Sequence, residues 1–195
     1  MAVPLRLFIA IDLPPHLRLA LGREIDRLAL LAPEKVVRWV RPDAIHLTLK
    51  FLGDCPAGRV DEIAAAMAQS ARGVEPFSIV AGGLGLFPNP QEPRVIWAGL
   101  QEATGRLAVL QKRVEEGIAR LGIEPERRGY NPHLTLGRTG RDTGLAEKRR
   151  LGEALAIQIL PILAEAPVSE ITLFRSELKP GRAIYTRLSV APFQA

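Results

Sequence analysis

Cysteine, histidine and aromatic residues are scarce in this sequence of 195 residues, which holds one cysteine, three histidines and 5% Phe, Trp and Tyr. The single cysteine, Cys55, excludes an intramolecular disulfide framework and a cysteine-rich zinc site, and we interpret it as a small buried residue. The most apolar run, residues 156–168, is interrupted by a glutamine, a proline and a glutamate, whereas a membrane helix needs about 18 apolar residues. The apolar stretch 7–11 is too short for a secretory signal. We therefore expect one cytoplasmic domain spanning residues 1–195.

Positive charge is in modest excess. The 26 basic residues outnumber the 21 acidic ones, and 21 of the 26 are arginines. Because the planar guanidinium suits phosphate, this excess permits a polyanionic ligand such as nucleic acid. A GC-rich coding bias would also favour arginine, so the charge alone does not decide between the two explanations.

A short motif occurs twice in the chain. Two of the three histidines open the same tetrapeptide, His46-Leu47-Thr48-Leu49 and His133-Leu134-Thr135-Leu136, at an offset of 87 residues. The same offset aligns apolar segments and helical patterns on both sides of each motif. Each half therefore predicts the order strand, helix, strand with the motif, helix, strand, with repeats at about 5–81 and 93–190.

The expected elements follow from apolar spacing and turn residues. They are strands at 7–9 and 94–96, helices at 14–28 and 107–121, helices at 60–67 and 145–157, closing strands at 77–81 and 168–177, and a last strand at 183–190 after the turn Lys179-Pro180-Gly181. The glycine-rich segment 82–85 and the following Pro88-Asn89-Pro90 are predicted to form a loop between the halves.

The motif alternates between polar and apolar residues, as a half-buried strand does. Strict alternation places Ile45, Leu47, Leu49 and Phe51 on the core face and His46, Thr48 and Lys50 on the other. A single histidine in a strand is usually a surface residue. Two copies at equivalent places, facing one cleft, instead predict an acid–base pair, since imidazole both donates and accepts protons near neutrality.

Other chemistries have weaker support. A zinc site would need carboxylate ligands beside the two histidines, and no His-Glu-x-x-His pattern is present. A nucleophile elbow and a phosphate-binding Walker loop are also missing. The third histidine, His16, has no partner in the repeat and is interpreted as a surface residue. A metal-dependent hydrolase stays an alternative.

The paired motifs and their surroundings resemble the two-histidine (2H) phosphoesterase superfamily, and within it the bacterial and archaeal RNA 2′,3′-cyclic phosphodiesterases, historically called 2′-5′ RNA ligases. The resemblance covers nearly the whole chain. It rests on the two motifs together with residues 6–14, Arg38-Trp39-Val40, 46–53, 83–88 and 130–138.

The resemblance implies a fold and a reaction. The fold is α+β and LigT-like, with duplicated β-α-β-α-β units forming two pseudo-symmetric lobes of mainly antiparallel sheet around a central cleft, helices outside. The reaction is hydrolysis of an RNA 2′,3′-cyclic phosphate to a 2′-phosphate, without metal or other cofactor. By analogy, His133 accepts a proton from water, His46 protonates the departing 3′ oxygen, and the hydroxyls of Thr48 and Thr135 hold the phosphate oxygens.

Three further residues are candidates for contact with substrate. Arg138 is the family's phosphate contact, but strict alternation would place it on the leucine face, so Gly137 must allow a local twist. Tyr130 and Phe51 are candidates for support of the base or the ribose, with ordinary core packing as the alternative for each.

Alternatives to hydrolysis stay open. A related enzyme would join RNA ends, such as tRNA halves, through a 2′-5′ linkage, and a non-catalytic RNA-binding module could keep the same fold. The expected partners are RNA with 2′,3′-cyclic phosphate ends or small cyclic nucleotides, with no membrane and no obligate protein partner, so we expect a monomer.

Overall fold

The computed structural model describes residues 3–179 and 182–193. Its strands are β1 Leu5–Asp12, β2 Val37–Trp39, β3 His46–Cys55, β4 Phe77–Phe87, β5 Val95–Gln101, β6 His133–Thr139, β7 Ala164–Val168, β8 Glu170–Lys179 and β9 Arg182–Pro192. Its helices are α1 Pro15–Ala29, α2 Val60–Ala71, α3 Arg106–Ala119 and α4 Leu145–Ala156, with 3-10 turns at Pro42–Ala44 and Ala57–Arg59. The expected α+β class is confirmed.

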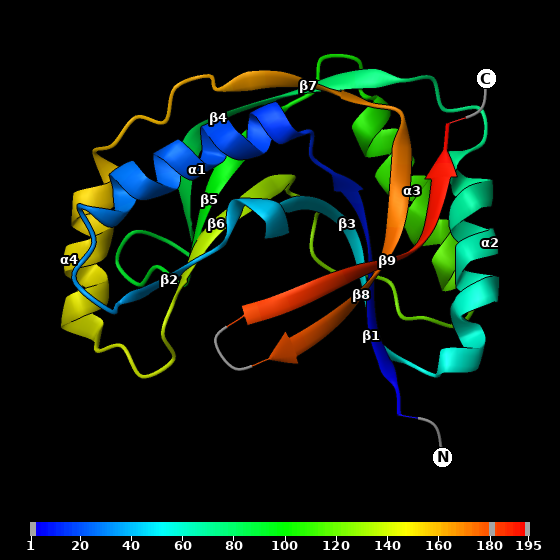
Figure 1. Ribbon diagram of the computed structural model, residues 1–195, viewed down its shortest axis with the longest axis horizontal. Coiled ribbons are helices and arrows are strands. Elements are labelled where there is room, and N and C mark those ends of the chain that lie inside the picture. The colour runs from blue at the N-terminus through cyan, green and yellow to red at the C-terminus, as the bar shows by residue number, and fades with distance from the viewer. Residues whose placement is uncertain (1–2, 180–181, 194–195) are drawn as a thin grey trace.

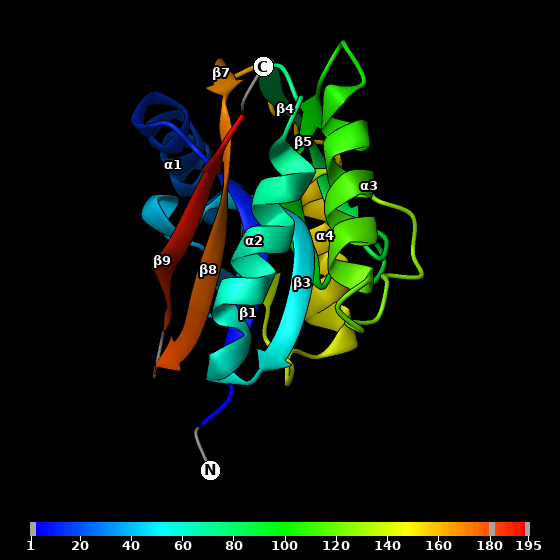
Figure 2. The ribbon, with the colours of Figure 1, turned by 90° about the vertical axis from the view of Figure 1, so that its right-hand side faces the viewer.

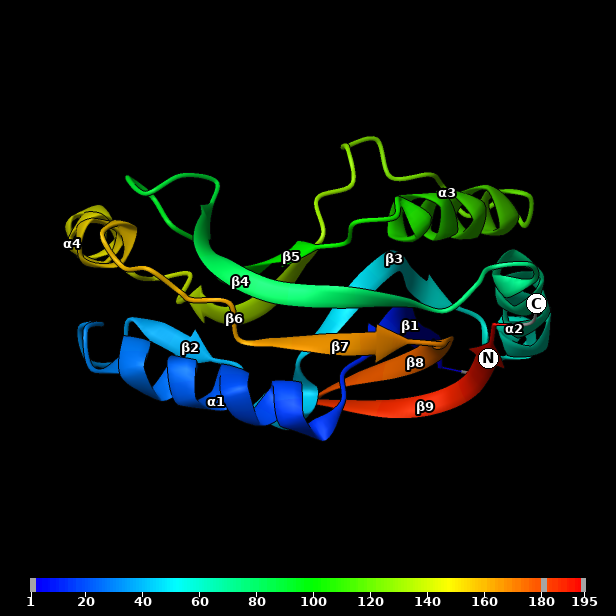
Figure 3. The same ribbon diagram turned by 90° about the horizontal axis from the view of Figure 1, so that it is seen from above.

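The helices form where apolar residues recur every three or four positions. The buried positions of α1 are Leu17, Leu21, Ile25 and Leu28, and those of α3 are Leu107, Leu110, Val114 and Ile118. Proline suits the first position of α1 because its missing N–H would have no helical partner there. All four helices lie around the outside of the strands (Figures 1, 2 and 3). No helix within the described ranges is long and apolar enough to cross a membrane.

The strands form one curled antiparallel sheet in the order β7-β4-β5-β6-β3-β1-β8-β9, with β2 added beside β6. The same pattern of strand pairing occurs twice, separated by the 87 residues that separate the two motifs. Asp12 pairs with His46 across β1 and β3, and Gly99 pairs with His133 across β5 and β6, so both partners are shifted by 87 residues. The duplication expected from the sequence is confirmed.

The closing strand of each repeat joins the other half of the sheet. β4, from the first repeat, pairs with β5, and β8, from the second repeat, pairs with β1. Each half is therefore completed by the other repeat, and neither repeat can form its half of the sheet alone. The repeat bounds 5–81 and 93–190 stay a prediction.

Several expected boundaries were wrong. The segment 82–85 is not a loop, because β4 continues through it to Phe87. A register shift between Gly82 and Leu84 absorbs the irregularity, and Gly83 has a φ of 75°, which glycine adopts without strain. The strand expected at 168–177 is divided between β7 and β8, and β2 was not expected at all. The turn expected at 179–181 includes residues 180–181, outside the described residues.

Candidate active site

The two motif strands are neighbours at the centre of the sheet. Leu47 on β3 pairs directly with Leu134 on β6, and both leucines are buried. The adjacent residues point to the opposite face, where the antiparallel register places His46 beside Thr135 and Thr48 beside His133. Diagonal neighbours in such a ladder are about 7–8 Å apart, so the two histidines flank one small region of the sheet.

Both imidazoles are held in the same way. His46 Nδ1 lies 2.9 Å from the carbonyl oxygen of Ala44, and His133 Nδ1 lies 2.8 Å from that of Asn131. Because a carbonyl only accepts, Nδ1 carries the hydrogen in each ring and Nε2 is left to act on a ligand. The two carbonyls are also 87 residues apart, so the sequence repeat is reproduced in the orientation of its histidines.

His46 lies among aromatic rings. Its ring centroid is 4.6 Å from that of Phe8, and Tyr185 on β9 meets it edge-on at 5.0 Å. Burial lowers the pKa of His46 to about 4, outweighing the Ala44 carbonyl and Asp12, which raise it; the charges of Arg18 and Arg138 lower it further. The His46 ring is therefore neutral near pH 7 in the unliganded protein.

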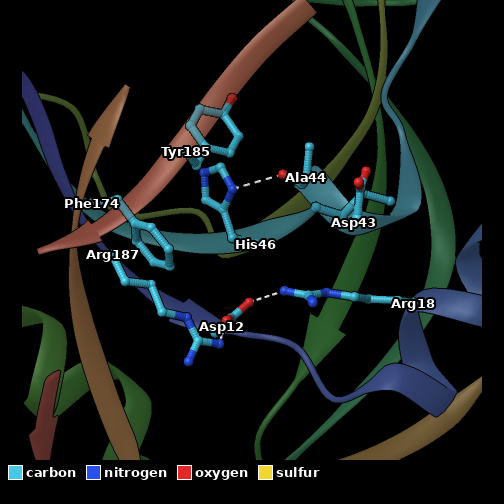
Figure 4. Close-up of a pocket in the computed structure, with 9 residues that line it drawn as sticks. Asp12, Arg18, Asp43, Ala44, His46, Phe174, Tyr185 and Arg187 are labelled. Atoms are coloured by element: carbon cyan, nitrogen blue, oxygen red, sulfur yellow. Dashed lines mark hydrogen bonds and ion pairs between the residues drawn. The ribbon is translucent and has the colours of Figure 1, made fainter. Parts of the chain in front are cut away.

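A cavity of about 170 Å³ opens beside His46 (Figure 4). Asp12 lies in its wall and accepts hydrogen bonds from Arg18 on α1 and Arg187 on β9. The residues that line the cavity come from elements distant in sequence. They are Asp12, Arg18, Asp43, Ala44, Ile45, His46, Phe174, Tyr185 and Arg187. The cavity combines charged groups with an aromatic wall next to the imidazole.

The surroundings of His133 are different. Phe87 meets its ring edge-on at 5.2 Å and stacks on Trp97 at 4.8 Å. The indole of Trp97 lies across Gly85, where a Cβ would come within 2.0 Å of the ring. Glycine in β4 therefore makes room for an aromatic wall beside His133.

A β-bulge in β3 changes the faces expected for Lys50 and Phe51. The register shifts between Ile9 and Ala10 of β1, so Lys50 pairs with the buried Ile9 and Phe51 pairs with Phe8. Lys50 is 4% exposed and Phe51 is 63% exposed. Strict alternation was wrong for both residues: Lys50 points into the interior and Phe51 lies on the face of the histidines. Core packing is excluded for Phe51.

A second bulge has the same effect on Arg138. The register shifts between Ile96 and Trp97 of β5, so that Arg138 pairs with Val95 and lies exposed on the site's face. The irregularity expected at Gly137 occurs one residue earlier, because Leu136 is left without a partner on β5 while Gly137 pairs with Ile96. A Cβ on Gly137 would lie 2.8 Å from Val37. Arg138 lies close enough to His46 for its charge to lower the pKa of that imidazole.

Tyr130 connects the two motif strands. Its hydroxyl donates to the backbone carbonyl of Thr48 at 3.3 Å, and burial raises its pKa. This contact braces β3 against the segment that enters β6. Tyr130 therefore packs against the core and positions the motif strands.

His16 and Cys55, the two residues predicted to lie outside the site, have the exposure expected from the sequence. His16 is exposed, with Nε2 2.9 Å from the carbonyl of Glu165, and Cys55 is buried, as expected for both. Among residues 3–179 and 182–193, no group of three or more His, Cys, Asp and Glu side chains is placed to hold one metal ion.

Sequence reasoning missed the aromatic residues around the histidines. A signal for two of them was present, because Phe87 and Phe174 are themselves 87 residues apart and each follows a leucine. Asp12 and Tyr185 carry no such signal, since strand pairing alone brings them to the site.

Comparison with known proteins places this site in a family. The model of the LigT like Phosphoesterase family matches residues 11–97 and again 99–185. The RNA 2′,3′-cyclic phosphodiesterase of Methanothermobacter thermautotrophicus is 36% identical over 95% of this chain and 97% of its own, and that of Thermus thermophilus is 35% identical over 94% and 88%. The crystal structure of E. coli LigT complexed with 3′-AMP has a TM-score of 0.77 at 27% identity and covers 98% of this chain and 99% of its own. The chain belongs to the LigT-like phosphoesterase family.

Proposed function

We propose that the protein hydrolyses the 2′,3′-cyclic phosphate at the end of an RNA to a 2′-phosphate, without a metal ion. The observation that carries the proposal is the pairing of the two motif strands, which brings His46 and His133 to one face with Nε2 of each ring left for a ligand. Relatives of similar length that carry the name RNA 2′,3′-cyclic phosphodiesterase support the choice of substrate.

The reaction needs one proton acceptor and one donor on opposite sides of the phosphorus atom. In the proposed mechanism, Nε2 of His133 takes a proton from water as the water oxygen bonds to phosphorus. The bond from phosphorus to the 3′ oxygen breaks, and His46 gives its Nε2 proton to that oxygen. The hydroxyls of Thr48 and Thr135 donate to the non-bridging oxygens, where negative charge grows.

The proton on His46 has to arrive with the substrate. Burial holds the pKa of this imidazole near 4 in the unliganded protein, so the ring is neutral at pH 7. A bound phosphate anion favours the charged imidazolium and offsets the nearby charge of Arg138. Binding of the substrate thus supplies the condition under which His46 acts as the donor.

Identification of the product tests the proposal. The protein is incubated with 2′,3′-cyclic AMP, and with an oligoribonucleotide ending in a 2′,3′-cyclic phosphate, in the presence of a chelator. Formation of the 2′-phosphate is expected from both. Formation of the 3′-phosphate would contradict the assignment of the leaving oxygen, and loss of turnover in chelator would contradict metal independence. Joining of two RNA ends would instead favour the ligase alternative.

We further propose that the protein acts as a monomer in the cytoplasm on RNA ends or small cyclic nucleotides. The residues of the site all come from one chain, and the two halves of the sheet supply one histidine each. Sedimentation at concentrations that support turnover tests the monomer.

A further inference from the structure

Two arginines lie directly opposite each other at the end of the site. Arg38 on β2 pairs with Arg138 on β6, so their side chains emerge on the same face of the sheet. Like charges at directly opposed positions destabilise an antiparallel pair. Both residues are exposed, and neither guanidinium has a hydrogen-bond or ion-pair partner among residues 3–179 and 182–193. Phosphate groups bound to these guanidinium groups would offset the repulsion.

The packing of β2 holds this pair in place. Val37 and Trp39 alternate with Arg38 and point to the other face, where their side chains lie 2.8 and 2.9 Å from the position that a Cβ on Gly137 would take. The next residue, Val40, donates from its backbone N–H to the carbonyl of Leu136 at 2.8 Å. The apolar side of β2 therefore fixes Arg38 opposite Arg138.

The pair continues the row of groups that faces the phosphate in the proposed reaction. Thr135 and Arg138 are on the same face of β6, and Arg138 is close enough to His46 to affect its pKa. Arg38 lies on β2, which pairs with the edge of β6 that faces away from β5. Directly opposed residues are about 5 Å apart, and arginine side chains are long enough to diverge from there toward two neighbouring phosphates.

We propose that Arg38 binds the phosphodiester on the 5′ side of the terminal nucleotide while Arg138 contacts the cyclic phosphate. The site would then favour RNA strands over cyclic mononucleotides, which lack that phosphodiester. This inference rests on the proposed function. We choose a phosphodiester as the ligand of Arg38 for two reasons. The planar guanidinium of arginine matches two phosphate oxygens, and the neighbouring Arg138 is itself the proposed contact of the cyclic phosphate.

The test compares two substrates in one variant. With Arg38→Gln, kcat/KM for an oligoribonucleotide ending in a 2′,3′-cyclic phosphate is expected to fall about 10-fold, and kcat/KM for 2′,3′-cyclic AMP is expected to stay unchanged. The slope of log(kcat/KM) for the oligonucleotide against log salt concentration should decrease in magnitude by about 0.7, the contribution of one phosphate contact to a single strand. Arg38→Lys should restore part of the loss, and Arg150→Gln, an exposed arginine on α4, should change neither substrate.

Other outcomes separate the inference from the proposed function. Equal losses on both substrates, or no loss on either, would overturn the role of Arg38. A lowered Tm in Arg38→Gln together with equal losses would assign it a structural role, whereas removal of like-charge repulsion predicts an unchanged or higher Tm. If the wild-type protein turned over neither substrate, the proposed function would fail. Equilibrium binding of the same oligonucleotide, with its salt slope, would still decide the inference.

Discussion

Phe51 and Arg138 occupy equivalent positions in the two repeats, 87 residues apart, and each is brought to the face of the histidines by a β-bulge in its own motif strand. Phe51 pairs with Phe8, and Arg138 pairs with Val95, which is the counterpart of Phe8. The duplicated backbone thus presents an aromatic ring from one repeat and a guanidinium from the other. The two halves of the site therefore have different chemistry.

Phe51 is expected to stack on a nucleobase of the substrate. Its side chain is 63% exposed, an unusual exposure for phenylalanine, and it lies on the face of the two histidines. Stacking on an aromatic side chain contributes about 1–3 kcal/mol per base, so Phe51→Ala should raise KM for the oligonucleotide about 5- to 150-fold. Phe51→Tyr keeps the ring and should keep KM. Steady-state kinetics measures both, and an unchanged KM in Phe51→Ala would exclude stacking.

Alternation predicts the faces of a strand only while the strand is regular. The positions of His46 and Thr48 followed from the motif, because the strand is regular up to that point. Lys50 and Phe51 did not, since an extra residue in one strand reverses every later side chain and depends on the partner strand. Arg138 was open to prediction because the neighbouring glycine marked a possible irregularity, whereas nothing near Lys50 does so.

The pairing of strands that are far apart in the chain could not be predicted from the sequence, for a related reason. The local pattern predicts that β4 and β8 are strands, but the exchange of these strands between the halves depends on contacts far apart in the chain. Arg38 lies in a strand of three residues, too short for periodicity to identify. Its position opposite Arg138 is visible only once β2 is seen to pair with β6.

Removal of either paired imidazole should stop most of the reaction. His46→Ala and His133→Ala are each expected to lower kcat about 10²- to 10⁴-fold, because each removes one proton transfer from the mechanism. His16→Ala is the matched control, since this histidine is exposed and bonds only a carbonyl of β7 among the described residues. The measurement is turnover of 2′,3′-cyclic AMP. Near-wild-type rates in either site variant would refute the acid–base assignment.

Anion binding should be coupled to uptake of a proton by His46. The pKa of its imidazole is about 4 in the unliganded protein, chiefly through burial, so the ring carries no proton at pH 6. An anion held beside the ring raises that pKa, and at a pH between the free and the bound value the complex takes up as much as one proton. Calorimetric titration with sulfate, which does not itself titrate in this range, in two buffers of different ionisation enthalpy measures the uptake.

The control for this linkage is His46→Asn, which keeps a polar side chain but does not titrate. It should take up fewer protons on sulfate binding than the wild-type protein does, because only His133 then supplies an imidazole at the site. Binding of sulfate to the wild-type protein with no uptake at pH 6 would mean that the ring stays neutral beside an anion, and His46 could not then be the proton donor.

The buried pair of Lys50 and Glu115 should stabilise the fold around the entry to β6. Lys50 Nζ donates to Glu115 at 2.5 Å and to the carbonyl of Glu124 at 3.1 Å, with the lysine side chain 2% exposed. Lys50→Met leaves a largely buried carboxylate without its cation and is expected to lower the free energy of unfolding by about 3–5 kcal/mol in urea denaturation.

The pair on the outside of the same helix provides the comparison. Lys112 and Glu116 on α3 are 3.9 Å apart with side chains 77% and 56% exposed, so Lys112→Met should change the free energy of unfolding by less than about 1 kcal/mol. In the double variant Lys50→Met with Glu115→Leu, apolar groups replace both charges, and much of the lost stability should return. Equal effects of Lys50→Met and Lys112→Met would show that burial of the ion pair does not set its contribution to stability. An absence of recovery in the double variant would place the loss in the hydrogen bonds that Lys50 donates to the Glu124 carbonyl and that Glu115 accepts from the Glu126 N–H.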